Sequence, residues 1–323
     1  MEKDGMEKEK NMIALFFGKE RTTFKQLHVF SIPKNQNFIT LRECFLSKSR
    51  YNDNLKFEGE YLDGERNGKG KEYDVDGKLK FEGEYFNGKI WNGKVKEYDY
   101  NNKIEFEGEY INGKRNGKVK EYDDKSKLKF EGEYSNDKRN GKGKEYYNGK
   151  LKFNGGYLNG KRNGKGIEYD NGKLKFEGEY SNEKRNGKGK KYYDNGKLKF
   201  EGEYLNNKIW NGNGYDINGD IIYEIKNGKG YIKEYEDGKL KFEGEYLNGE
   251  MNGKGIEYNY QGKSLFEGEY LNGKRWNGIG KEYYYDIYLK FEVEYLNGEM
   301  NGKGKEYNYQ GKSLFEGEYL NGK

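Results

Sequence analysis

The chain has 323 residues, of which 36% are charged, but 61 Lys and Arg against 56 Asp and Glu leave a formal net charge of only +5. Only 32% of the residues are hydrophobic, and aromatic residues, at 17% of the chain, supply about half of that share. This composition excludes a large aliphatic core and, with it, a compact two-domain enzyme. The many aromatic residues and the low net charge also argue against disorder of the whole chain.

Residues 1–54 differ from the rest and predict a small N-terminal head that is partly disordered. They contain the chain's single His, Pro and Cys and none of the repeats described below. Residues 27–32 have strand character, and a capping-box pattern predicts a short helix over residues 40–47. The segment either caps the aromatic end of the array that follows or forms a separate targeting or partner-binding head, and the pattern leaves both open.

The single cysteine, Cys44, excludes an internal disulfide and fits a reducing compartment. No apolar run of the sequence approaches the roughly 18 residues that a membrane span needs. We therefore expect a cytoplasmic protein, with a peripheral position at a membrane as the alternative.

Residues 55–323 are a repeat array. A Phe-Glu-Gly-Glu-Tyr motif returns every 23–25 residues, and one 42-residue gap hides a shortened unit in which Tyr223–Ile225 stands for the strand. We count twelve units, the last one truncated. The motif, or its close variant, begins at Phe57, Phe81, Phe106, Phe130, Phe153, Phe176, Phe200, Phe242, Phe266, Phe291 and Phe315.

Each unit predicts two short antiparallel strands. Residues 55–61 alternate strictly, with Leu55, Phe57, Gly59 and Tyr61 on one face and Lys and Glu on the other. Asn-Gly turns close the hairpin, and adjacent apolar substitutions in the second strand indicate a bulge. The glycine on the aromatic face leaves room for neighbouring rings, which then form a continuous ladder. The predicted fold is all-β: an elongated, solenoid-like array of hairpins in a single twisted meander sheet.

The segment 176–189, Phe-Glu-Gly-Glu-Tyr-Ser-Asn-Glu-Lys-Arg-Asn-Gly-Lys-Gly, resembles the MORN repeat. Tyr stands where that family usually has Trp at the strand end, Val293 replaces the strand glycine and Gly156 replaces a glutamate, so the chain looks like a variant. The resemblance implies a twisted antiparallel meander that serves as a scaffold or dimerisation module. It also allows an antitoxin-like or effector role as a weaker alternative.

The glutamate pairs of the strands, such as Glu58 and Glu60, are the obvious candidates for acid–base chemistry. Catalysis needs one differentiated environment, whereas these pairs recur in many equivalent copies and are expected to form a solvated face. With only His28 and Cys44, no triad, dyad or multi-His metal site can be assembled. We therefore predict a protein that is not an enzyme and that has no cofactor, metal site or catalytic residue.

The turn between the two strands of each repeat, which we call the first turn, carries charges that suggest one binding surface. Repeated Lys-Arg pairs are expected on one long edge, where they could attract an anionic membrane by forces that salt would screen. The residues of this edge are Lys114, Arg115, Lys138, Arg139, Lys161, Arg162, Lys184 and Arg185. Nucleic acid is disfavoured, because the rings needed for base stacking are committed to the inner face.

Three tryptophans, Trp91, Trp210 and Trp276, occur in first turns and either fold back over their hairpins or anchor a protein partner. Taken together, the sequence predicts a non-enzymatic scaffold for protein–protein interaction. Unpaired backbone groups at sheet edges would allow self-association, for example as a homodimer. The alternative is a peripheral adaptor that binds anionic lipid through the basic edge.

Overall fold

The computed structural model describes residues 15–17, 20–29, 43–51, 54–236, 238–320 and 322. Its contacts divide the chain into two units, Met1–Gly149 and Lys150–Lys323, which are taken one at a time below. Every helix or strand element of the described residues is a β-strand, so the all-β prediction is confirmed.

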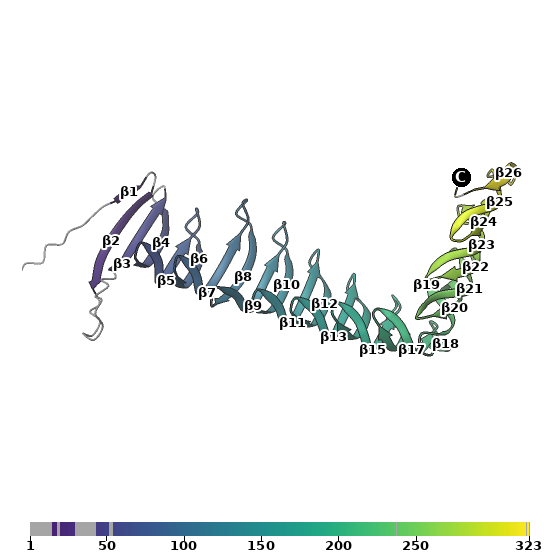
Figure 1. Cartoon of the computed structure of the whole chain (residues 1–323), viewed down its shortest axis with the longest axis horizontal. Coiled ribbons are helices and arrows are strands. Elements are labelled where there is room, and N and C mark those ends of the chain that lie inside the picture. Colours follow the sequence, from purple (N-terminus) through teal and green to yellow (C-terminus); the bar gives the residue numbers. More distant parts are fainter. Residues whose placement is uncertain are drawn as a thin grey trace, which may run out of the picture. The chain divides into compact units, whose positions relative to one another are not determined.

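In the first unit each strand pairs antiparallel with the next strand in sequence, so that the hairpins follow one another in chain order (Figure 1). The strands are β1 (Leu15–Phe17), β2 (Glu20–Val29), β3 (Glu43–Tyr51), β4 (Asn54–Leu62), β5 (Glu65–Tyr73), β6 (Leu79–Phe86), β7 (Lys89–Tyr98), β8 (Ile104–Ile111), β9 (Lys114–Tyr122), β10 (Leu128–Ser135) and β11 (Lys138–Tyr147).

The second unit is also a meander, with two ladders, β12 to β18 and β19 to β26, which an isolated bridge between Lys226 and Lys229 joins (Figure 1). The strands are β12 (Lys150–Leu158), β13 (Lys161–Asp170), β14 (Lys173–Ser181), β15 (Lys184–Tyr192), β16 (Leu198–Leu205), β17 (Lys208–Tyr215), β18 (Ile221–Ile225), β19 (Gly230–Glu236), β20 (Lys239–Leu247), β21 (Glu250–Tyr258), β22 (Ser264–Leu271), β23 (Lys274–Tyr284), β24 (Tyr288–Leu296), β25 (Glu299–Tyr307) and β26 (Ser313–Tyr319).

The prediction of a helix over residues 40–47 is wrong for residues 43–47, which the structure describes as strand. Strand β3 starts at Glu43, and all nine of its residues pair with β4 or β2. Hydrogen bonds to two neighbouring strands outweigh the local preference of a capping box, which is worth only about 1 kcal/mol. Residues 40–42 lie outside the described residues, as do residues 30–32 of the strand expected over 27–32, whose first three residues end β2.

The hairpins have the expected turns, and they contain bulges. Between β12 and β13 the residues Asn159 and Gly160 both take positive φ, at 51° and 86°, as the tight hairpin turn requires. The second strand does contain a bulge, since the register shifts between Gly155 and Tyr157, opposite residues 163–165, but the adjacent positions Gly166 and Ile167, from which the sequence indicated it, pair regularly with Gly155 and Asn154. The shortened unit is β18 with a four-residue turn from Lys226 to Lys229.

The core is a line of phenylalanine rings on one sheet face. Phe176 is fully buried between Tyr180 of its own strand and Tyr204 of the next repeat, with edge-on ring centroids at 5.7 and 5.1 Å. A Cβ placed on Gly178 would lie 2.6 Å from the tip of the Phe176 ring, so the strand glycine makes the space for the ring of its own strand. Such edge-on pairs add about 0.5–1.5 kcal/mol each beyond the burial of area.

Candidate functional site

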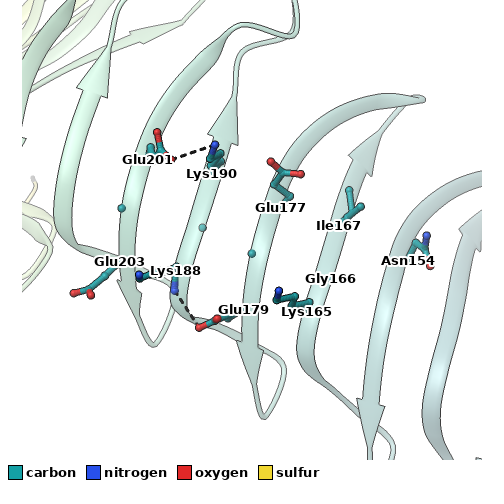
Figure 2. Close-up of a pocket in the computed structure, with 13 residues that line it drawn as sticks. Asn154, Lys165, Gly166, Ile167, Glu177, Glu179, Lys188, Lys190, Glu201 and Glu203 are labelled. Atoms are coloured by element: carbon teal, nitrogen blue, oxygen red, sulfur yellow. Dashed lines mark hydrogen bonds and ion pairs between the residues drawn. The ribbon is translucent and has the colours of Figure 1, made fainter.

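A groove of the second unit crosses the opposite, polar face of strands β12 to β16 (Figure 2). Its volume is about 650 Å3. The floor is a row of glycines that face one another across the strands, because Gly166 pairs with Gly178, Gly178 with Gly189, and Gly189 with Gly202. We call it the glycine-row groove. Its floor is backbone, because a side chain at these positions would point to the aromatic face, as the Cβ placed on Gly178 does, while the residues on both sides of the row point into the groove.

Two rows of side chains form the walls of the glycine-row groove. In the first row Lys190 lies between Glu177 and Glu201 in register, and its ammonium is 3.2 Å from the Glu201 carboxylate. Figure 2 shows this ion pair as a dashed line. In the second row Lys188 is paired in register with Glu203. The groove therefore offers alternating charges at regular spacing along both walls.

The glutamates of the walls are positioned, not simply solvated as the sequence suggested. The Glu177 carboxylate accepts a hydrogen bond of 2.6 Å from the Tyr192 hydroxyl, and burial together with Glu177 raises the pKa of this tyrosine to about 12. The Glu179 carboxylate accepts the backbone N–H of Lys188 at 3.2 Å, as Figure 2 shows. This second bond satisfies a backbone donor at the bulge next to Gly187, whose φ is 108°.

The first unit has a related groove of about 410 Å3 across β6 to β9. Five lysines and three glutamates line it: Lys80, Lys94, Lys96, Lys118, Lys120, Glu82, Glu107 and Glu109. The glycine-row groove of the second unit has three lysines and four glutamates instead: Lys165, Lys188, Lys190, Glu177, Glu179, Glu201 and Glu203. The two grooves thus share a shape but differ in charge. The groove of the first unit has two more lysines than glutamates, whereas the glycine-row groove has one more glutamate than lysines.

On the aromatic face the repeats are joined by a cluster of tyrosine, glutamate and arginine, which we call the Tyr–Glu–Arg cluster. The Tyr180 hydroxyl donates to Glu168 of the previous repeat at 2.5 Å, and the Arg185 guanidinium bonds the same carboxylate. Burial alone would raise the pKa of Glu168, but the hydrogen bonds from Arg185 and Tyr180 outweigh it and lower the pKa. The same tyrosine-to-glutamate bond joins Tyr85–Glu72, Tyr110–Glu97, Tyr134–Glu121, Tyr246–Glu234, Tyr270–Glu257 and Tyr319–Glu306.

The structure separates the Lys-Arg pairs that the sequence placed on one basic edge. Each arginine lies over the phenylalanine ring of its own hairpin, with the guanidinium carbon 4.1–4.4 Å from the ring centroid. These stacked pairs are Arg115–Phe106, Arg139–Phe130, Arg162–Phe153 and Arg185–Phe176. The lysines of the turns are exposed: Lys114 and Lys138 in the first unit, Lys161 and Lys184 in the second. The guanidiniums are thus engaged with the rings, whereas the lysines point into solvent.

The three tryptophans all pack on the next turn of their unit. Trp91, Trp210 and Trp276 are half-buried, and each lies against a turn glycine. The glycine N–H donates to the tryptophan carbonyl at 2.8–2.9 Å in the pairs Gly113–Trp91, Gly228–Trp210 and Gly298–Trp276. The exposed part of each ring keeps partner anchoring open as a prediction.

His28 and Cys44 were the two residues of the head considered for chemistry. The register of β2 and β3 places them opposite each other, but their side chains lie outside the described part. Among the described residues, no group of three His, Cys, Asp or Glu side chains is arranged to hold a metal ion.

The family comparison matches this architecture. The MORN repeat model matches residues 57–78, 106–118, 130–150, 153–173, 176–197, 242–263 and 294–312. These seven matches fall on the hairpins described above, and the chain belongs to the MORN-repeat family. No curated protein matches the chain significantly. Within the described ranges, no helix has the length and apolar character needed to cross a bilayer.

Proposed function

We propose that the protein is a non-enzymatic scaffold that binds protein partners along the polar face of its repeats. The observation that carries this proposal is the glycine-row groove, a side-chain-free floor between two walls of alternating Lys and Glu. An extended peptide fits such a floor closely, and its charged side chains pair with the walls. Charge patterns of this kind set the register and choice of partner more than they set raw affinity.

The test reverses the charge of one wall. Glu201→Lys combined with Glu203→Lys changes β16, and the matched control, Glu316→Lys with Glu318→Lys, makes the same changes in the same motif of β26, outside the groove. We expect partners captured from host extract at about 0.15 M salt to fall at least tenfold for the groove variant and to stay within twofold for the control. Equal retention by both variants would contradict the proposal.

The exposed turn lysines favour a second candidate, a peripheral adaptor at an anionic membrane. A Lys161→Glu, Lys184→Glu variant tests it by flotation with vesicles that contain anionic lipid, at low salt where the attraction is strongest. Loss of flotation in this variant, with partner capture unchanged, would favour the membrane role. No flotation of the unmodified protein would remove that role.

A further inference from the structure

One repeat of the second unit breaks the Tyr–Glu–Arg cluster. In this array the tyrosine hydroxyl bonds a glutamate 12 or 13 residues earlier, as Tyr110 bonds Glu97 and Tyr134 bonds Glu121. Thirteen residues before Tyr204 stands Lys191, which lies in register between Phe176 and Phe200 just where the glutamate would be. The arginine position is also changed, because Ile209 pairs with Tyr204 as Arg185 pairs with Tyr180.

These substitutions leave a polar group without a partner. Tyr204 is only 4% exposed, and its hydroxyl oxygen is buried with no hydrogen bond. A buried hydroxyl without a partner costs about 1–3 kcal/mol. Lys191 is an exposed residue, but desolvation by the protein around its ammonium lowers its pKa. No ion pair or hydrogen bond joins this ammonium to the part of the chain that the structure describes.

The local charges do not balance. Around Lys191, Glu168 is shared by Arg185 and Arg162, Asp194 by Lys175 and Lys173, and Lys241 pairs with Glu236. Lys191 and Lys199 face Glu234 in addition, so positive charge is in excess at this place. Glu234 already accepts the Tyr246 hydroxyl at 2.5 Å, and Lys199 donates to the Tyr235 carbonyl at 2.8 Å.

We propose that the Lys191 position binds a carboxylate of an acidic partner segment, which the Lys191 ammonium and the Tyr204 hydroxyl hold in the place that a glutamate takes in neighbouring repeats. The partner thus supplies the side chain that this repeat lacks. Ile209 leaves the carboxylate without competition from an arginine of the next repeat. Because the Tyr204 hydroxyl is enclosed, the ligand oxygen reaches it when the Lys191 side chain swings outward, and no bond to a described residue opposes that movement.

This inference rests on the proposed scaffold function and names the chemistry of one partner. The probe is an eight-residue peptide of alternating Glu and Gly with blocked ends, and its counterpart has Gln in place of Glu. We expect the Glu peptide to bind the full chain in fluorescence anisotropy and the Gln peptide to bind at least tenfold more weakly. Similar binding of the two peptides would overturn the proposal, because the carboxylate would then be irrelevant.

Two variants locate the site. Lys191→Glu should weaken binding of the Glu peptide at least tenfold, whereas Lys197→Glu should change it less than threefold. Lys197 is the matched control, because it is an exposed lysine in the turn that follows the same strand and changes the charge equally, but lies outside the lining of the glycine-row groove. Equal losses in the two variants would show general charge attraction and would overturn the site.

A third variant and a competition keep the test independent of folding. Tyr204→Phe removes only the unpartnered hydroxyl and should weaken binding about threefold, while hydrogen exchange of β14 to β16 stays at least as slow as before. Acetate should displace the peptide at lower concentration than inorganic phosphate. The reverse order would mean a phosphate site and would overturn the carboxylate. Failure of these peptide tests leaves the Glu201 and Glu203 capture experiment unaffected, so the two proposals can fail separately.

Discussion

Two neighbouring repeats of the second unit use the same positions for different purposes. Around Tyr180 the tyrosine hydroxyl and the Arg185 guanidinium both donate to the Glu168 carboxylate and tie this hairpin to the one before. Around Tyr204 that cluster is absent, and the charges at this place lie near β19 of the second ladder instead, as the Lys199 bond to the Tyr235 carbonyl shows. The repeat that lacks the cluster is thus one that also makes a contact between the two ladders.

The difference teaches that the aromatic core and the polar cluster are separate contributions to stability. Phe200 is as well buried as Phe176, at 1% and 0% exposure, although only Phe176 has an arginine over its ring. Burial of the rings therefore persists where the cluster is missing. Variants that affect one contribution at a time can measure each of them.

The largest effect is expected from the rings. Phe176→Ala removes a fully buried side chain and should lower the local free energy of unfolding by about 3–5 kcal/mol. Phe315→Ala, at a ring that is 43% exposed, should cost less than half as much. Hydrogen exchange followed by mass spectrometry over β14 to β16 and over β26 measures both. Similar costs at the two sites would contradict the ring-based account of stability.

The next effect tests the glycine row. In Gly178→Ala the new Cβ would lie 2.6 Å from the Phe176 ring and 2.7 Å from the Lys188 carbonyl oxygen. Because the backbone of β15 cannot yield, we expect a loss of about 2 kcal/mol. Gly172→Ala is the control, since its Cβ meets no atom within 4 Å and only its φ of 84° opposes the change. Thermal unfolding should rank the two variants in this order, and the opposite ranking would refute close packing at the row.

The comparison of the two repeats is sharpest in the hydroxyls. Tyr180→Phe removes a hydrogen bond to a carboxylate. It should lower the free energy of unfolding by about 1.5 kcal/mol, the lower end of the range for bonds to charged groups, because the pair is only part-buried. Tyr204→Phe removes a hydroxyl that has no partner and should leave the free energy of unfolding unchanged or raise it by up to about 1 kcal/mol. Equal losses in urea titrations of the two variants would mean that Tyr204 has a bond in solution.

The smallest effect is expected from acid. The pKa of Glu168 is lower in the folded chain than in the unfolded one, so its contribution is complete above the ordinary value of about 4.5 and is lost as pH falls through the folded pKa. The stability difference between the unmodified protein and Glu168→Gln should therefore shrink as pH falls from about 5 to about 3. A constant difference across this range, measured by urea unfolding, would contradict the shift.

Much of the fold could be predicted from the sequence because its signals are local. The two-residue alternation around Phe176, the Asn-Gly turns and the 23–25-residue spacing each depend on neighbours in the chain, and the structure confirms the hairpins that they predict. The place of the bulge was not accessible in this way, because the adjacent positions Gly166 and Ile167 pair regularly and the register shifts at residues 163–165 instead.

The polar contacts could not be predicted in the same way. Arg185 follows Lys184 directly, so the pair reads as one charged edge, yet the register turns the arginine onto the Phe176 ring and leaves the lysine in solvent. The bonds of the Tyr–Glu–Arg cluster span 12 to 18 residues and become visible only when strands are placed in register. The one available signal was the fixed spacing from Glu to Tyr, which Lys191 interrupts.

The bond from each tyrosine to the preceding hairpin has a consequence for how such an array changes length. Where the tyrosine of a repeat bonds the preceding hairpin and its glutamate accepts the tyrosine of the next one, removal of that whole repeat brings a tyrosine to an equivalent glutamate. From Glu97 to Tyr134, gain or loss of a whole repeat therefore preserves this bond. Such a change is not neutral at Lys191, where removal of a single hairpin would erase the feature that distinguishes this repeat from its copies.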